Sequence, residues 1–345
     1  MNTGSRKTKK PFIIPVFLPH AGCPNRCVFC DQTAITGEKP SLPSAESLCE
    51  QVNSFVAYKN KTRKNVQIAF YGGNFLGLAE KNVRMLLEEA AAFVRAGKVD
   101  SIRFSTRPDT IDAVRLNWLK AFPISAIELG VQSMDDSVLT LSNRGHTAKN
   151  TQKAVELLKE KKYQIGLQLM LGLPGDNEAR AVKSAQKTVD LSPDFVRIYP
   201  TVVLKNSPLA RLFQRGEYQP LSLEAAVSLA KKFYRIFEAR GIPVIRMGLQ
   251  SSEELDAGTN ILAGPYHPAF GQLVYADFFL DKARSLLQNL KNSPESISIQ
   301  IHPRSLSRLQ GIRNQNIMTL KKEFGLQSIA MVTDNSLAEN ELKVV

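Results

Sequence analysis

The sequence predicts an α/β fold in which a partial (βα)6 barrel of the TIM-like kind precedes a small C-terminal α/β module. First, six short apolar runs alternate with six longer amphipathic runs, which is the order of a parallel sheet with helical crossovers. Second, the stretches rich in cysteine, glycine and arginine follow the ends of the expected strands, where βα barrels place their active sites. An open doubly wound sheet has the same element order, but the position of these stretches favours the barrel.

Each expected strand is a short apolar run that ends at polar, glycine or proline residues. These runs are Phe12–Leu18, Val66–Tyr71, Ser101–Thr106, Ala126–Val131, Gln164–Leu171 and Asp194–Thr201. The expected helices carry apolar residues three and four positions apart. They are Ser44–Tyr58, Ala79–Ala96, Thr110–Ala121, Ala148–Lys161, Ala179–Asp190 and Leu223–Arg240. For the third of these helices, Pro108-Asp109 is a start signal.

The bulk properties of the 345 residues indicate a cytoplasmic globular protein with a basic surface. The hydrophobic share is 43%, and no apolar run is long enough to cross a membrane or to form a secretion signal. The net charge of +13 favours contact with a polyanion such as nucleic acid. We expect a basic disordered arm (residues 1–10), the barrel (11–250), a connecting loop and helix (251–293) and the C-terminal module (294–345).

Three of the four cysteines lie within eight residues, directly after the first expected strand. Thiolates of Cys23, Cys27 and Cys30 at this spacing suit an iron–sulfur cluster with three protein ligands, which leaves one iron open. A disulfide is disfavoured because the chain shows no secretion signal. A zinc site is the stronger alternative, because His20 adds a fourth ligand of a suitable kind.

The cysteine spacing, with Phe29 before the last cysteine, resembles the cluster loop of the radical S-adenosylmethionine (radical SAM) enzymes. The resemblance implies that Cys23, Cys27 and Cys30 hold a [4Fe–4S] cluster whose open iron binds SAM. Gly72-Gly73 resembles the glycine-rich turn that binds the amino group of SAM, and Phe29 is expected beside the adenine. Taken alone, the two glycines also fit an ordinary turn, and Phe29 fits a core aromatic.

Further motifs, in this order along the chain, resemble the radical SAM half of the catalytic subunit of Elongator, which modifies the wobble uridine of tRNA. They are Phe70–Phe75, Ser105–Asp109, Glu128–Ser133, Arg144–Thr147, Gly172–Gly175, Pro193–Thr201 and Arg215–Pro220. The cofactor-binding residues that the resemblances and strand positions imply are Phe29, Gly72, Gly73, Asn74, Thr106, Arg107, Glu128, Gln132, Arg144 and Gln168.

Simple chemistry agrees with these roles. Glu128, Gln132 and Gln168 lie at strand ends, from which they are expected to reach the ribose and amino group of SAM. Arg107 and Arg144 are permanent cations that suit a carboxylate or an RNA phosphate. Other interpretations stay open: Arg107-Pro108-Asp109 also fits a structural turn with Asp109 as helix cap. His146 fits either a proton donor or a histidine of a surface turn.

The chain departs from the Elongator subunit in two respects. About a hundred residues follow Ile242, without the pyrophosphate loop of an acetyltransferase, and the cysteine spacing is the compact one. We therefore expect this chain to initiate radical chemistry on RNA, with tRNA as the expected substrate and a reductase, flavodoxin or ferredoxin as electron donor. Two alternatives stay open: a radical SAM protein of the coproporphyrinogen-dehydrogenase or haem-handling type, and a non-catalytic metal-containing RNA-binding protein.

The C-terminal segment has a strand–helix–loop–helix–strand pattern after an expected helix, Phe278–Leu290. Its parts are Ser296–Ile301, Arg304–Gln310, the loop Gly311-Ile312-Arg313-Asn314, Gln315–Phe324 and Ser328–Thr333. The pattern resembles a minimal KH module, which clamps single-stranded RNA through a GxxG loop. Asn314 replaces the second glycine and tolerates the left-handed conformation. A small unit that caps the barrel is the alternative. Before it, Gly264–Gly271 fits a lid or a plain loop.

Overall fold

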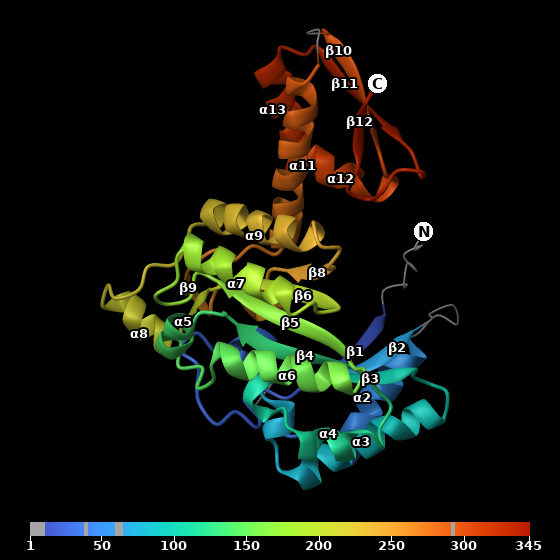
Figure 1. Cartoon of the computed structure of the whole chain (residues 1–345), viewed down its shortest axis with the longest axis vertical. Coiled ribbons are helices and arrows are strands. Elements are labelled where there is room, and N and C mark those ends of the chain that lie inside the picture. The colour runs from blue at the N-terminus through green and yellow to red at the C-terminus, as the bar shows by residue number, and fades with distance from the viewer. Residues whose placement is uncertain (1–10, 38–40, 59–64, 291–293) are drawn as a thin grey trace.

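The computed structural model describes residues 11–37, 41–58, 65–290 and 294–345, so the proposed basic arm lies outside the described residues. A curved sheet of seven parallel strands forms the body of the molecule (Figure 1). Its order is β1-β2-β3-β4-β5-β6-β8, which is the order along the chain. The strands are β1 (Phe12–Phe17), β2 (Val66–Tyr71), β3 (Ser101–Thr106), β4 (Ile124–Gln132), β5 (Gln164–Leu171), β6 (Phe195–Pro200) and β8 (Val244–Met247). Since β1 and β8 are both edges, the sheet is a partial barrel, and the predicted fold class is confirmed.

All six expected helices are present, with ends within a few residues of the predicted positions. They are α2 (Ala45–Ala57), α3 (Glu80–Arg95), α4 (Ala113–Leu119), α6 (Ala148–Glu160), α7 (Glu178–Asp190) and α9 (Leu223–Glu238). Only α4 begins clearly later than expected, because Asp112, not Asp109, caps it by accepting a hydrogen bond from the Arg115 amide. A single 3-10 turn, Pro108–Thr110, occupies the expected start.

Several short elements were not expected from the sequence. They are α1 (Gln32–Thr36), α5 (Asp136–Leu141), α8 (Pro208–Gln214), α10 (Glu253–Asp256), the 3-10 turn Phe75–Gly77, and the hairpin-like pair β7 (Val203–Leu204) and β9 (Ile261–Ala263). The seventh sheet strand, β8, was also not expected, because its four residues include Arg246 and an exposed Ile245. Only its pairing with β6 defines β8 as a strand, because its own four residues show no strand pattern.

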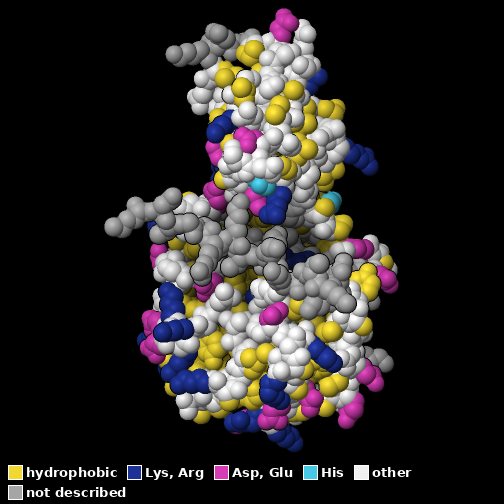
Figure 2. Space-filling model, turned by 90° about the vertical axis from the view of Figure 1, so that its right-hand side faces the viewer, with side chains coloured by type: hydrophobic (Ala, Val, Ile, Leu, Met, Phe, Trp, Pro, Cys, Tyr) yellow, Lys and Arg dark blue, Asp and Glu magenta, His cyan; other side chains and the backbone are white. Residues whose placement is uncertain are grey.

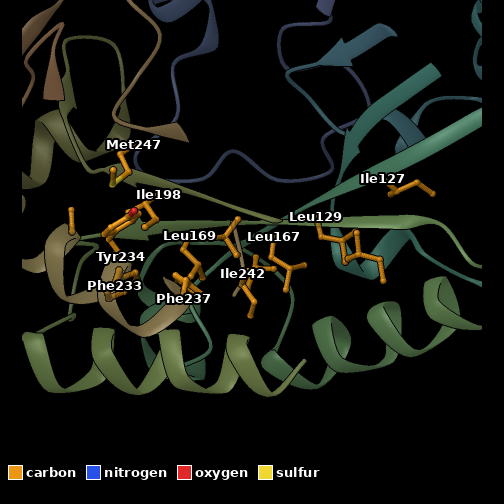
Figure 3. Packing of buried hydrophobic residues seen from close by; sticks show 14 of the residues in the cluster. Ile127, Leu129, Leu167, Leu169, Ile198, Phe233, Tyr234, Phe237, Ile242 and Met247 are labelled. Carbon is orange, nitrogen blue, oxygen red and sulfur yellow. The ribbon is translucent and has the colours of Figure 1, made fainter. Parts of the chain in front are cut away.

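Helix α9 covers the outer face of the sheet near β5 and β6. Figure 3 shows Leu167, Leu169 and Ile198 from the strands facing Phe233 and Phe237 from the helix. Each of these side chains is at most 1% exposed. Burial of a side chain of this size contributes about 1.5–3 kcal/mol. This outer layer leaves the polar residues at the strand ends free to face the inner side of the sheet.

The long helix α11 (Phe270–Gln288) joins the barrel to the C-terminal part of the chain (Figure 1). The predicted start at Phe278 was wrong, because Gly271 fits the first helical turn and is not part of a loop. A Cβ at Gly271 would lie 3.1 Å from the Met247 carbonyl oxygen, so a glycine lets the helix approach β8. Ion pairs from Lys231 of α9 to Asp277 (2.8 Å) and Asp281 (2.6 Å) hold α11 in place.

The C-terminal part forms a three-stranded sheet with order β11-β10-β12 beside two helices. Its elements are β10 (Ser296–Ile301), the 3-10 turn Pro303–Ser305, α12 (Leu306–Gln310), the 3-10 turn Ile312–Asn314, α13 (Gln315–Phe324), β11 (Ser328–Thr333) and β12 (Leu342–Val344). Strands β10 and β11 are parallel, and β12, which was not expected, is antiparallel to β10. Asn314 has φ 61°, so the expected left-handed conformation is confirmed. No helix among the described residues is long and apolar enough to cross a membrane.

Candidate active site

A cavity of about 740 Å³ lies on the inner side of the sheet, at the ends of the strands. Its wall brings together segments that are far apart in the sequence, from the cysteine loop after β1 to the loop after β8. Of the residues expected to form the site, those that line the cavity are Cys23, Cys27, Phe29, Cys30, Gly72, Gly73, Thr106, Arg107, Gln132, Arg144 and Gln168. Two others, Asn74 and Glu128, lie behind the wall.

The cysteine loop is anchored by backbone hydrogen bonds to distant parts of the barrel. The amide of Val28 donates to the Ser142 carbonyl (3.1 Å), and the Val28 carbonyl accepts from the Leu209 amide (2.7 Å). Cys27 is buried, and its Sγ accepts a hydrogen bond from Nη1 of Arg144 at 3.1 Å. The loop is therefore fixed at the cavity wall by its middle residues, and the three thiols are all free.

The electrostatics of the loop favour neutral thiols when no cation is present. Burial and the neighbouring Cys27 and Cys23 raise the pKa of Cys30 to about 12, and burial also raises the pKa of Cys23. A bound metal cation reverses this preference and favours thiolates. Among the described residues, no three Cys, His, Asp or Glu side chains form a ready-made metal site. The chemistry of three thiols on one cavity wall nevertheless fits a cluster with three protein ligands.

His20, the fourth ligand of the zinc alternative, is engaged in the local hydrogen-bond network. Its Nε2 accepts from the Gln32 amide at 3.0 Å, and its own amide donates to Oε1 of Gln32 at 2.5 Å. The same Oε1 accepts from the Gly73 amide at 2.8 Å. His20 and Gln32 thus join the cysteine loop to the glycine turn, and the hydrogen bond from Gln32 occupies Nε2 of His20.

The glycine turn after β2 requires glycine on steric grounds. Gly73 has φ 53°, and a Cβ there would lie 2.3 Å from the Ala21 carbonyl oxygen and 2.6 Å from that of Leu18. Both contacts are to backbone atoms, which cannot move aside as a flexible side chain does. The turn therefore packs directly on the start of the cysteine loop.

Both the nitrogen and the oxygen of the Asn74 side-chain amide form hydrogen bonds to neighbouring loops. Its Nδ2 donates to the Gly22 carbonyl (3.0 Å), while its Oδ1 accepts from Oγ1 of Thr106 (2.7 Å) and from the amide of Arg107 (3.0 Å). The side chain is buried, and the cavity wall does not include it. In this structure Asn74 positions the loops after β1, β2 and β3 relative to one another.

Glu128 of β4 is the centre of a buried charge cluster behind the cavity. Its carboxylate pairs with Nε of Arg197 at 2.7 Å and with Nη1 of Arg103 at 3.2 Å, and its side chain is 0% exposed. The hydroxyl of Tyr71 donates to it at 3.3 Å, and Nε2 of Gln168 does so at 3.4 Å. The prediction placed Glu128 at the barrel mouth, where it would contact SAM. In the structure its carboxylate is buried and neutralises arginine side chains.

Gln132 ends β4 in a conformation that is rare for a residue with a side chain. Its φ is 67°, and the pairing of β4 with β5 shifts register between Gly130 and Gln132. Among the described residues, no hydrogen-bond partner exists for its buried Oε1. Non-glycine residues held at positive φ gather at functional sites. Gln132 therefore lines the cavity and keeps a buried amide oxygen that has no hydrogen-bond partner among the described residues.

Arg107 and His146, two other predicted polar residues, are both buried. Arg107 pairs through Nε (3.0 Å) and Nη2 (2.9 Å) with Asp109, so this pair, and not a cap by Asp109, shapes the turn after β3. His146 does not lie on the surface, because it is 6% exposed. Burial, with help from nearby Arg144, lowers the pKa of His146 to about 3, so its ring is neutral at physiological pH.

Comparison with known proteins identifies the class to which this site belongs. Residues 17–188 match the family model for the radical SAM superfamily, and residues 193–278 match the model for the Radical_SAM C-terminal domain. An uncharacterized protein of Methanocaldococcus jannaschii is 30% identical over 239 residues, which are 65% of this chain and 71% of that protein. This chain belongs to the radical SAM superfamily.

Two further similarities are to a tRNA uridine(34) acetyltransferase in sequence and to an Elp3 structure in fold. The tRNA uridine(34) acetyltransferase of M. jannaschii is 34% identical over 127 residues, which are 36% of this chain and 24% of that enzyme. The chain thus spans only about a quarter of that relative. A solved structure of Methanocaldococcus infernus Elp3 has a TM-score of 0.60 at 22% identity, over 79% of this chain and 63% of that one, and supports the shared fold.

Sequence reasoning gave no site role to several polar residues that line the radical SAM cavity, among them Tyr71, Arg197, Tyr199 and Arg246. A signal existed for one pair, because Arg197 and Tyr199 are two positions apart on β6 and must share a face of the sheet. Arg246 gave no signal, since its strand was not recognised. In the structure it lies directly opposite Arg197 in the β6–β8 pairing.

Proposed function

We propose that this protein is a radical SAM enzyme in which Cys23, Cys27 and Cys30 hold a [4Fe–4S] cluster that binds SAM. One observation carries the proposal: a single cavity brings these three thiols together with the loops that end β2, β3 and β4. A reduced cluster held by these three thiolates would supply the one electron for cleavage of SAM to methionine and a 5′-deoxyadenosyl radical, and that radical would take a hydrogen atom from the substrate. A reductase, flavodoxin or ferredoxin supplies the electron.

The protein's own contribution is to bind and orient SAM in this cavity. The backbone at Gly72 and Gly73 lets the methionine part approach without a Cβ in the way. The free Oε1 of Gln132 accepts a hydrogen bond from the amino group or a ribose hydroxyl of SAM. Phe29, half-buried at the wall, packs beside the adenine. Thr106, Arg107, Arg144 and Gln168 complete the wall, and Asn74 and Glu128 hold its loops and charges in place.

The proposed substrate is RNA, and within RNA we favour tRNA. The similarity to tRNA uridine(34) acetyltransferases and the net charge of +13 support it. The module of residues 294–345 adds a third argument, since its turn between α12 and α13 resembles the RNA-clamping loop of KH modules. In that turn Gly311, Arg313 and Asn314 all have positive φ, and Arg313 is exposed.

Cluster binding is tested by replacing one cysteine at a time and reconstituting the protein without oxygen. Cys27→Ala is expected to lose the iron and sulfide bound by the wild-type protein, because two thiolates do not hold the cluster firmly. Cys49→Ala is the control, since Cys49 lies on α2 outside the cavity. Full iron content in Cys27→Ala would refute the assignment, and zinc without iron in the wild-type protein would support the structural-metal alternative.

The role of the C-terminal turn in RNA binding is tested in the full-length chain. Arg313→Gln is expected to weaken tRNA binding and to reduce the slope of log affinity against log salt by about 1, because one phosphate contact is lost. Arg95→Gln, an exposed arginine on α3, removes the same charge elsewhere and is the control. Equal tRNA binding by both variants would remove the turn from the proposal.

A further inference from the structure

The cavity wall carries an unusual excess of positive charge. Five arginines line it, and no aspartate or glutamate among the described residues does; they are Arg26, Arg107, Arg144, Arg197 and Arg246. On the face drawn in Figure 2, by contrast, Lys and Arg side chains are scattered among acidic and apolar ones. A concave site with cations of one sign focuses their field and attracts anionic ligands. The cavity is therefore suited to a ligand that carries negative charge.

Most of these arginines have an identified partner behind or beside the wall. Arg107 is paired with Asp109, and Arg197 is paired with Glu128. Arg144 donates to the sulfur of Cys27, within the proposed cluster site. Arg26 donates to the Asn206 carbonyl at 2.9 Å. Arg246 has the weakest contact of the five arginines, and among the described residues no carboxylate forms an ion pair with it. Its one recorded hydrogen bond is a long one, from Nε to the Gly248 carbonyl at 3.4 Å.

The position of Arg246 makes this lack of a partner costly. It stands directly opposite Arg197 across the β6–β8 pairing, and like charges in that arrangement repel. The carboxylate of Glu128 is already shared by Arg197 and Arg103, which leaves the group of three arginines two positive charges in excess. The hydroxyl of Tyr199 accepts a weak hydrogen bond from Arg197 at 3.4 Å, and Tyr199 lines the same cavity as both arginines.

We propose that Arg246 binds a phosphate group of the substrate at the β6–β8 end of the cavity, with the Tyr199 hydroxyl beside it. A planar guanidinium offers paired donors that match phosphate oxygens, and a dianion or a phosphodiester relieves the repulsion between Arg246 and Arg197. Strands β8 and β1 are the two edges of the sheet. The segment after β8 packs on the helix that follows the cysteine loop, since Ile35 packs in one apolar cluster with Leu249 and Leu255, so the phosphate site lies in the same cavity as the proposed cluster. This inference rests on the proposed function, because it names the part of an RNA substrate that enters the cavity.

Calorimetric titration of the full-length, reconstituted protein tests the phosphate site. The probes are uridine 5′-monophosphate, uridine, and a short RNA hairpin. Arg246→Gln is expected to weaken binding of the phosphate-bearing probe by about tenfold to a hundredfold, the loss typical of a hydrogen bond to a charged group. Uridine binding stays unchanged. Arg246→Lys keeps the charge and retains part of the affinity, while Arg95→Gln behaves as the wild type.

The pattern of probe binding identifies the source of the phosphate. A free nucleotide is indicated if uridine 5′-monophosphate binds and Arg246→Gln weakens it. A phosphate within an RNA chain is indicated if only the hairpin binds. In that case Arg246→Gln lowers the affinity for the hairpin and reduces the slope of log affinity against log salt by about 1. The proposal is overturned if Arg246→Gln weakens neither probe, or if Arg95→Gln weakens them equally.

Cleavage of SAM without substrate separates this proposal from the radical SAM function itself. Arg246→Gln is expected to keep its iron content, because Arg246 supplies no ligand to the proposed cluster, and basal formation of 5′-deoxyadenosine is measured on the wild-type protein. Suppose that the wild-type protein forms no 5′-deoxyadenosine but binds phosphate, and that Arg246→Gln binds phosphate more weakly. The phosphate site would then stand, and the radical function would fail. Basal cleavage with no effect on any phosphate probe would support the radical function and overturn the phosphate site.

Discussion

Replacement of Glu128 by glutamine tests whether the buried charge cluster is organised as described. The carboxylate is fully buried and lies 2.7 Å from Nε of Arg197 and 3.2 Å from Nη1 of Arg103. Glutamine has the same shape but no charge, so two largely buried guanidinium groups lose their counter-ion. Breaking a buried ion pair from one side costs about 3–5 kcal/mol, because the remaining charge is left desolvated without compensation. We expect Glu128→Gln to lower the free energy of unfolding by that amount.

Urea unfolding of the metal-free protein, followed by circular dichroism, measures this loss. Glu80→Gln is the matched control, since Glu80 forms an exposed pair with Arg84 at 2.7 Å on α3. An exposed pair of this kind contributes less than about 1 kcal/mol. If Glu128→Gln and Glu80→Gln change the unfolding free energy equally, Glu128 does not neutralise the arginines and the described organisation of the cavity floor is wrong.

Three further variants test the loops and the pH response. Gly73→Ala is expected to displace the cysteine loop and lower the iron content, because the new Cβ would clash with the Ala21 carbonyl. The control Gly97→Ala has a similar φ and open space around it, so it is expected to keep its iron. Asn74→Ala is expected to lose about 3 kcal/mol of unfolding free energy, since buried hydrogen-bonding groups lose their partner; unchanged urea unfolding would contradict this. His146 has a pKa near 3 when folded and about 6.5 when unfolded, so stability falls as the pH drops below about 6.5. His146→Gln is expected to make the loss of unfolding free energy below pH 6.5 smaller than in the wild type. The same pH dependence in both proteins would refute this role of His146.

Six of the seven strands of the sheet were predictable because they are largely buried apolar runs. Runs such as Val66–Tyr71 and Gln164–Leu171 are apolar along most of their length, and their ends in the structure are the predicted ones. Their carboxyl ends necessarily meet at one edge of a parallel sheet, so the cysteine loop and the glycine turn could be placed together without coordinates. What the pattern could not supply is strand β8, whose identity depends on pairing with β6.

Two differences at the site have the same physical cause. The sequence shows that Glu128 and Asn74 lie at strand ends, but not whether a polar side chain at such a place faces a ligand or a protein partner. Glu128 faces Arg103 and Arg197, and Asn74 hydrogen-bonds to backbone groups of the loops after β1 and β3. These partners are distant in sequence, so only the folded chain reveals that both residues position the wall and do not form it.

The most direct test of the central claim is formation of 5′-deoxyadenosine from SAM by the reduced, reconstituted protein without oxygen. We predict that the wild-type protein forms it, that bulk tRNA increases the rate, and that Cys27→Ala forms none. Formation that tRNA does not change would keep the radical chemistry and contradict the RNA substrate. No 5′-deoxyadenosine from a wild-type protein that carries its full iron and sulfide would contradict the proposed radical SAM activity.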